Sequence, residues 1–237
     1  MTIKETMNPN KTARIAGVLY LSIAFLAPFG EMFVRQSLIV PGDAATTASN
    51  IVASEGLFRL GFVSDLVVQI IHIFLVLALY NLLKPANKNH ALLMVTLGLV
   101  GVPIAMLNEL NQVASLHLSS GADYLAAFAP DQLQALVPLF LDLHEQGVFI
   151  AQIFWGLWLF PLGYLVFKSG YIPRILGILL IIGGLGYLID CLTIFLFPNL
   201  DLTISPFTFW GEVLLPLWLL IKGVNVEQWE ERALESA

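Results

Sequence analysis

A long apolar run at residues 147–167 constrains this chain more than any other feature. Between Gly147 and Phe167 the only polar side chain is Gln152, and Lys168 follows the run directly. At 1.5 Å per residue, this run reaches about 30 Å as a helix, which is the thickness of the hydrocarbon core of a bilayer. The run therefore predicts a transmembrane helix.

The composition indicates that this helix is one of several. Hydrophobic residues make up 58% of the chain and charged residues 12%, about half the charged fraction of an ordinary soluble domain. The mean hydropathy is +0.83. Segments of about ten residues with alternating polarity, the mark of a membrane β-barrel, are absent. We expect an all-α, polytopic membrane protein whose main partner is the lipid bilayer and which binds no nucleic acid.

Six apolar stretches define the expected membrane domain, residues 1–223, and an acidic tail follows at 224–237. The spans are expected at about 13–39, 57–83, 91 to the break at 119–121, 147–167, 173–197 and 206–221. A short surface helix is expected at 44–55, with Asp43 as its N-cap and Gly56 as its C-terminal stop. The sequence thus predicts a six-helix bundle with short surface helices in its outer loops.

Special residues mark two further features of these spans. Glycines in the fifth span should allow close helix packing, and three prolines are candidate kinks. The third span carries a continuous polar face in its outer half, at i, i+3, i+4 and i+7. The glycines are Gly177, Gly183, Gly184 and Gly186, the prolines Pro103, Pro138 and Pro161, and the polar face Asn108, Asn111, Gln112 and Ser115.

The distribution of basic residues predicts the orientation. Nine of the eleven lysine and arginine residues fall on one side of a six-span arrangement, the side that holds both termini: Lys4, Lys11, Arg14, Lys84, Lys88, Lys168, Arg174, Lys222 and Arg232. Positive residues concentrate on the cytoplasmic side of membrane proteins. We therefore expect a multi-pass protein of the cell membrane with both termini in the cytoplasm and outer loops at about 40–56, 118–134 and 198–205.

Four acids within the spans point to a polar pocket. Asp65, Glu109, Asp190 and Glu212 come from different spans and lie in their outer halves. One ionised acid at the centre of a membrane helix costs about 2.5–3.5 kcal/mol, so four would cost about 10 kcal/mol. A whole domain is stable by only about 5–15 kcal/mol. We expect these acids to be hydrated, paired or protonated.

Two arginines on the predicted outer side can offset part of this charge. Glu31 and Arg35 are four residues apart and can pair on one helix face, and Arg59 precedes Asp65 by six residues. Two cations cannot neutralise all of the outer acids. The predicted pocket is therefore net acidic.

A further group of ionisable residues, Asp142, His144 and Glu145, precedes the apolar run. A zinc-protease helix would need a second histidine at position 148, where this chain has Val148. Haem ligation by His72 and His144 would need both at one depth, whereas the spans place His72 near the midplane and His144 near the outer mouth. If a metal is held, we expect its ligands to be His144 with Asp65 and Asp190.

Several sequence strings resemble the bacterial membrane family DUF4386, and the resemblance covers about residues 12–223. They are residues 14–20, 38–43, 53–61, 174–177, 186–190, 211–212 and 219–223. The resemblance implies a shared membrane topology and no particular reaction. At position 72 the family is more often acidic, so His72 is a departure. The positions that match the family's recurrent polar residues are Glu31, Arg35, Arg59, Asp65, His144, Asp190 and Glu212.

Three functions fit these residues. The first is an outward-facing acidic pocket that binds or transports a small cationic solute, a metal ion or protons. The second is an intramembrane metal-dependent hydrolase acting on lipids, with His144 and some of Asp65, Asp142, Glu145 and Asp190 around an activated water. The third is a non-catalytic membrane scaffold, for which the acidic tail from Glu227 onward is the specific support.

Overall fold

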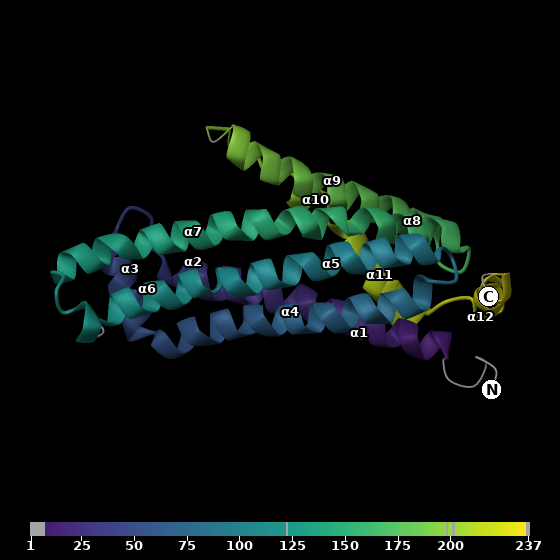
Figure 1. Ribbon diagram of the computed structural model, residues 1–237, viewed down its shortest axis with the longest axis horizontal. Coiled ribbons are helices and arrows are strands. Elements are labelled where there is room, and N and C mark those ends of the chain that lie inside the picture. Colours follow the sequence, from purple (N-terminus) through teal and green to yellow (C-terminus); the bar gives the residue numbers. More distant parts are fainter. Residues whose placement is uncertain (1–7, 122, 198, 201, 236–237) are drawn as a thin grey trace. The chain divides into compact units, whose positions relative to one another are not determined.

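The computed structural model describes residues 8–121, 123–197, 199–200 and 202–235 (Figure 1). Lys4 of the predicted inner side and the predicted loop residues 122, 198 and 201 lie outside this range. The described part contains helices and no strand. Five of its helices are by themselves long and apolar enough to cross a membrane, at Pro9–Leu38, Glu55–Leu83, Lys88–Ser120, Pro130–Ser169 and Arg174–Leu196. The predicted all-α, multi-pass class is confirmed.

The sixth span is shorter than the others. Helices α10 (Ser205–Thr208) and α11 (Trp210–Ile221) follow each other directly and together reach about 25 Å, somewhat less than a hydrocarbon core of about 30 Å. Residues Ser205–Ile221 and helix α12 (Val226–Glu235) are together long and apolar enough for a span, but the chain bends by 103° between them. Counting this bent pair as one span gives the predicted six.

The first span is interrupted by a π-helix. Helix α1 (Pro9–Pro28) continues into the π-helical segment η2 (Phe29–Arg35) and then α2 (Gln36–Leu38). A π-helix is wider than an α-helix, is rare, and is frequent at functional sites. Here it carries Glu31 and Arg35.

The short helix α3 (Ala44–Ala53) has the predicted N-cap but not the predicted end. The Thr46 backbone N–H donates to Asp43 Oδ1 at 2.9 Å and its hydroxyl donates to Asp43 Oδ2 at 2.7 Å, and these bonds lower the pKa of Asp43. The prediction that Gly56 stops this helix is wrong. Helix α4 (Glu55–Leu83) already begins at Glu55, because a single glycine in a first helical turn costs too little to prevent it.

Two of the remaining long spans each consist of two helices that meet at one turn residue, and this residue still has α-helical backbone angles. Helices α5 (Lys88–Asn108) and α6 (Leu110–Ser120) meet at Glu109, and α7 (Pro130–Leu157) and α8 (Leu159–Ser169) meet at Trp158. The break at Trp158 lies one turn before Pro161, whose missing N–H and ring disturb the preceding turn. Pro103 and Pro138 lie inside uninterrupted helices. The turn η3 (Asp123–Leu125) and helix α9 (Arg174–Leu196) complete the elements.

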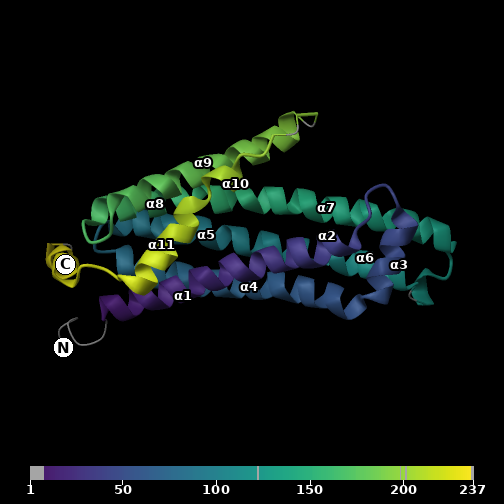
Figure 2. The same ribbon diagram turned by 180° about the vertical axis from the view of Figure 1, so that it is seen from behind.

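The chain forms two compact units, which are described separately. Unit 1 comprises the described residues of Met1–Ile23, Ile71–Val102 and Ala151–Ala237. Its core contains Leu75, Leu79, Trp158, Leu162 and Leu180, all almost fully buried. Helices α8 and α9 form a close pair, and α11 crosses α1 at Gly17 (Figure 2).

Glycines explain how closely α9 approaches its neighbours in unit 1. A Cβ placed on Gly177 would overlap the carbonyl oxygen of Gly163, and one on Gly184 would lie 2.7 Å from the carbonyl oxygen of Gly156. Backbones can approach to this distance only where no side chain intervenes. The predicted close packing of the fifth span is confirmed.

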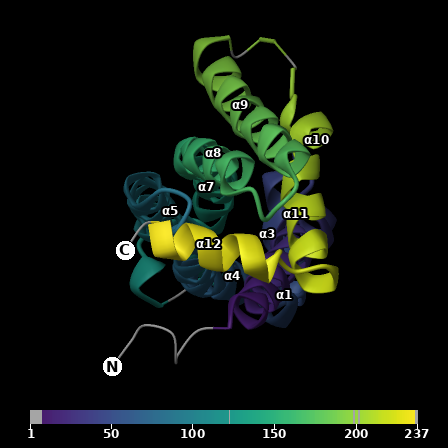
Figure 3. The same cartoon turned by 90° about the vertical axis from the view of Figure 1, so that its right-hand side faces the viewer.

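The described part of the C-terminal tail contains a helix, α12, which is attached to α4 of unit 1. Helix α12 crosses the end of α4 (Figure 3), where Trp229 Nε1 donates to the Leu82 carbonyl oxygen at 2.8 Å. The Tyr171 hydroxyl donates to the same oxygen at 2.9 Å. A carbonyl in the last turn of a helix has no partner within that helix. Two side chains from other segments therefore satisfy it and fix the tail.

Unit 2 comprises Ala24–Ile70 and the described residues of Pro103–Ile150. Helix α3 lies beside α6 (Figure 1). A small apolar core contains Val34, Ile51, Phe58, Leu116 and Val137. The candidate site lies in this unit, where η2, α4, the break between α5 and α6, and α7 each contribute a polar side chain.

Candidate cation site

Three side chains in unit 2 form a cluster that could hold a metal ion. Asp65 comes from α4, Glu109 from the break between α5 and α6, and His144 from α7. One ligand atom of each lies within 4.8 Å of the others, and His144 Nε2 is 3.2 Å from Glu109 Oε1. Glu109 and His144 are buried, at 7% and 3% exposure. We call this set the acidic cluster.

The π-helical turn of the first span adds an arginine to the acidic cluster. Arg35 Nη1 donates to Asp65 Oδ2 at 2.5 Å, and Arg35 Nε donates to Glu31 Oε2 at 2.7 Å. The Arg35 side chain is 9% exposed, whereas that of Glu31 is 52% exposed. One buried guanidinium thus bonds both the largely buried carboxylate of Asp65 and the exposed carboxylate of Glu31.

The amide of Gln112, on α6, lies at the centre of the acidic cluster. Its Nε2 is 2.6 Å from Glu109 Oε2, 3.0 Å from His144 Nε2 and 3.4 Å from Asp65 Oδ2. Its Oε1 is buried and has no hydrogen-bond partner in the described part of the chain. Gln112 as a whole is only 1% exposed. All three cluster residues therefore face one amide nitrogen.

Neighbouring residues hold the backbone of the cluster in place. Asn108 Nδ2 donates to the His144 carbonyl oxygen at 2.8 Å, and its side chain fills the space where a Cβ on Gly147 would stand. A Cβ on Gly30 would lie 2.6 Å from Asp65 Oδ1. Glycine at these two positions leaves room for the polar side chains of the site.

The site carries more negative than positive charge. Glu31, Asp65 and Glu109 contribute three carboxylates, and Arg35 is a guanidinium in contact with the first two. Separating charges from water costs several kcal/mol per ion unless partners compensate. With a neutral His144 and all three acids ionised, the site has two negative charges in excess of Arg35. Glu31 is 52% exposed and therefore hydrated, so the largely buried pair Asp65 and Glu109 exceeds Arg35 by one charge.

Three other candidates from the sequence do not join this cluster. Arg59 Nε contacts Glu55 Oε1 at 2.7 Å in an exposed i, i+4 pair, so it does not neutralise Asp65 as expected. Asp142 and Glu145 flank His144 in sequence but are exposed. Residues two before and one after His144 point away from its face of the helix.

Asp190 and Glu212 belong to unit 1, and each has a partner there. Asp190 Oδ1 accepts the Ile204 backbone N–H at 2.6 Å and Oδ2 accepts that of Ser205 at 2.9 Å. These bonds cap the start of α10, so Asp190 has a structural partner in place of the expected metal. The Tyr20 hydroxyl donates to Glu212 Oε2 at 2.8 Å.

Replacing Asp190 by asparagine should destabilise the protein without changing its response to cations. The amide can accept only one of the two N–H groups and presents its own N–H₂ to the other, which costs about 1–3 kcal/mol. The measurement is the free energy of unfolding in mixed micelles, with and without added divalent cation. Unchanged stability together with a lost cation response would instead indicate that Asp190 is a ligand of the cation.

Sequence reasoning left two residues of the site out of the candidate set. Gln112 and Asn108 are uncharged, whereas the predicted site residues are all ionisable. The available signal was the polar face of the third span, on which both residues lie. Uncharged polar side chains within a bilayer need hydrogen-bond partners, just as charged side chains do.

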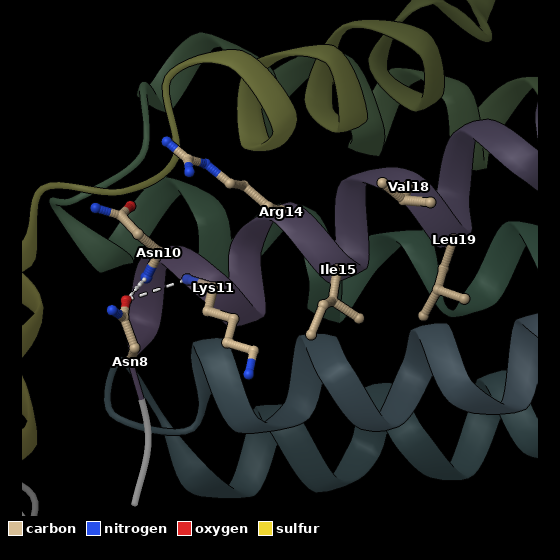
Figure 4. A pocket seen from close by; sticks show the side chains of 7 residues that line it. All are labelled: Asn8, Asn10, Lys11, Arg14, Ile15, Val18 and Leu19. Atoms are coloured by element: carbon tan, nitrogen blue, oxygen red, sulfur yellow. Dashed lines mark hydrogen bonds between the residues drawn. The ribbon is translucent and has the colours of Figure 1, made fainter.

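A separate surface pocket of about 400 Å³ lies along the start of α1 in unit 1 (Figure 4). It is lined by Asn8, Asn10, Lys11, Arg14, Ile15, Val18 and Leu19. The ionisable groups in this lining are Lys11 and Arg14, both exposed. The pocket thus offers no acid for a cation, unlike the acidic cluster.

Comparison with known proteins places the chain in a family. Residues 15–223 match the family described as "Domain of unknown function (DUF4386)". The chain belongs to the DUF4386 family. The predicted resemblance is therefore confirmed over nearly its whole extent, and all five residues of the acidic cluster and its Arg35–Glu31 extension lie within the DUF4386 match.

A relative from Archaeoglobus fulgidus supports this membership. It is named "Uncharacterized protein", and it is 35% identical over 159 residues, which cover 67% of this chain and 81% of the relative. No solved structure matches the chain. Neither the DUF4386 description nor the name of this relative gives an activity, so the function is inferred from the site.

Proposed function

We propose that this protein binds a small cation, a metal ion or a proton in the acidic cluster of unit 2 and moves it into or across the cell membrane. The observation that carries the proposal is the charge of the site. Two largely buried carboxylates, Asp65 and Glu109, lie beside a single guanidinium, Arg35, which bonds Asp65 and the exposed Glu31, within helices that are apolar enough to span a bilayer. Buried carboxylates in membrane helices typically mark ion or proton pathways.

Replacing Glu109 by glutamine should have opposite effects with and without cations. In cation-free buffer the variant should be at least as stable as the wild type, because it lacks one uncompensated buried charge. With added cation the wild type should gain stability while the variant gains little. Thermal unfolding of the full chain in detergent, across a panel of mono- and divalent cations, measures both effects.

Asp142→Asn is the matched control for this experiment. It removes one carboxylate from the outer half of the same bundle, but its side chain is exposed and outside the cluster. It should behave as the wild type in both buffers. Equal cation responses of Glu109→Gln and the wild type would contradict a cation site at the cluster.

Transport is tested with the purified protein in liposomes. The expected result is flux of the stabilising cation that depends on Glu109 and not on Asp142. Absence of flux for any cation that stabilises the protein would limit the function to binding. Absence of both stabilisation and flux would contradict the proposal as a whole.

We further propose that the cluster faces the outside, with both termini in the cytoplasm. The support is the concentration of lysine and arginine on the side of the termini. Cys191 is the only cysteine and is buried, so introduced cysteines can be labelled selectively. Ser49→Cys, on exposed α3, should react with an impermeant thiol reagent in whole cells, and Asn89→Cys should not. The reverse pattern would overturn this orientation.

A metal-dependent hydrolase is the second candidate. The observation in its favour is the ligand set, because catalytic zinc sites use three protein ligands and leave one position for water. Of the ligands predicted for a hydrolase, Asp65 and His144 lie in the cluster, and Glu109 joins them. Hydrolysis of a lipid ester or amide by metal-loaded protein, lost in His144→Gln, would favour this function over transport.

A further inference from the structure

The geometry of Gln112 points to the kind of cation and to a fourth ligand. Gln112 Nε2 lies 2.6 Å from Glu109 Oε2, 3.0 Å from His144 Nε2 and 3.4 Å from Asp65 Oδ2. Its two N–H groups suffice for the two carboxylates, because His144 Nε2 also lies 3.2 Å from Glu109 Oε1 and can donate to it. Its Oε1 is buried without a partner in the described part of the chain, which is unfavourable because a buried acceptor loses its bonds to water.

A half-turn of the amide about its last side-chain bond exchanges these two atoms. Oxygen and nitrogen of an amide have nearly the same shape, so the turn needs no extra space. It would bring Oε1 next to the carboxylates of Asp65 and Glu109 and the imidazole of His144. Four lone-pair atoms that face one another repel unless a cation or a shared proton lies among them, and a cation can contact all four.

The charge of the site selects a divalent ion. The carboxylates of Glu31, Asp65 and Glu109 exceed the guanidinium of Arg35 by two charges when His144 is neutral. A histidine must be neutral to bind a metal. One divalent cation therefore neutralises the site, whereas a monovalent ion leaves it negative.

The ligand types select among divalent ions. Ca²⁺ takes six to eight oxygen ligands, and Mg²⁺ prefers six in an octahedron. One imidazole nitrogen with three oxygens in a four-ligand site suits Zn²⁺, which is tetrahedral and accepts histidine, carboxylate and oxygen donors. Arg35 would then not bind the metal itself. Its hydrogen bond to Asp65 Oδ2 would orient Asp65 as a ligand.

We infer that unit 2 holds Zn²⁺, or a transition-metal ion of the same class, with Asp65, Glu109, His144 and Oε1 of Gln112 as ligands. In the metal-free protein the amide N–H₂ of Gln112 occupies the position of the ion and donates hydrogen bonds to the other ligands. This inference rests on the proposed function and narrows its cation to one class. It also gives Gln112 two roles, donor without metal and ligand with it.

The test is calorimetric titration of the full chain in detergent, after removal of metals with a chelator. Wild-type protein should bind one Zn²⁺ per chain and show no response to Mg²⁺ or Ca²⁺ at the same concentration. Gln112→Leu should lower the Zn²⁺ affinity by at least about tenfold, the range for losing a group that supports a metal site. Gln112→Glu keeps an oxygen at this position and should retain binding, and Asp142→Asn should match the wild type.

Each other outcome decides a separate point. Unchanged Zn²⁺ affinity in Gln112→Leu, or equal binding of Mg²⁺ and Zn²⁺ by the wild type, would overturn the inference. Binding of protons or organic cations without any Zn²⁺ binding would overturn it and leave the proposed function standing. If both Gln112 variants fail to fold, the visible absorption of wild-type protein loaded with Co²⁺ decides, because four-coordinate and six-coordinate Co²⁺ differ strongly. A six-coordinate spectrum would overturn the four-ligand site.

Discussion

Replacing Arg35 by methionine is expected to destabilise the protein by about 3–5 kcal/mol, the cost of removing one partner of a buried ion pair. The change keeps most of the side-chain volume but leaves Asp65 without its guanidinium, at a side chain that is only 15% exposed. It also leaves Glu31 unpaired. The measurement is the free energy of unfolding, from titration of mixed micelles with a denaturing detergent.

Arg59→Met is the matched control for Arg35→Met. Arg59 also pairs with a glutamate four residues away, at the same 2.7 Å distance, but these side chains are 54% and 43% exposed. Exposed pairs of this kind are worth about 0–1 kcal/mol. Similar costs for the two substitutions would show that the Arg35 pair is as hydrated as a surface pair, and the charge argument for the site would fail.

The second large effect is expected at Gly177, where α9 meets α8 in unit 1. Gly177→Ala places a methyl group against the Gly163 carbonyl oxygen and within 2.8 Å of the Phe167 backbone nitrogen. Both contacts are to backbone, so the helices must separate for the methyl group to fit. Overpacking of this kind costs about 1–3 kcal/mol, and sometimes more. The same unfolding titration measures it.

Gly56→Ala is the same substitution at a helical position where the added methyl group meets no neighbour. A Cβ at Gly56 has no atom within 4 Å among the described residues, so the change should stabilise the protein by about 0.5–1 kcal/mol through helix propensity. The two substitutions are therefore expected to have opposite signs. A stabilising Gly177→Ala would mean that α8 and α9 do not pack closely.

The membrane class and the spans could be predicted from the sequence because each depends on local composition. An apolar run long enough for a bilayer has few alternatives to a helix. The same holds for Asp43 as an N-cap and for the glycines of α9. The end of α3 could not be predicted, because Gly56 is tolerated in the first turn of α4 when that helix has a long apolar run behind it.

The site could be predicted only in part. Glu31 and Arg35 pair through local spacing, and Asp65, Glu109 and His144 were recognised as ionisable groups in apolar surroundings. Which of the acids meet depends on tertiary packing, and periodicity within one helix does not reveal it. Asp190 was therefore grouped with the ligands although it caps α10. The role of Gln112 depends on three residues from three other segments.

The central claim is that the acidic cluster of unit 2 holds a transition-metal ion such as Zn²⁺. An anomalous difference map at the zinc absorption edge, from crystals of the full chain grown with Zn²⁺, tests it most directly. The account predicts one peak, about 2.0–2.2 Å from carboxylate oxygens of Asp65 and Glu109 and from His144 Nε2, with Gln112 Oε1 turned toward it. A map without a peak there, in which the Gln112 N–H₂ still occupies the centre of the cluster, would contradict it.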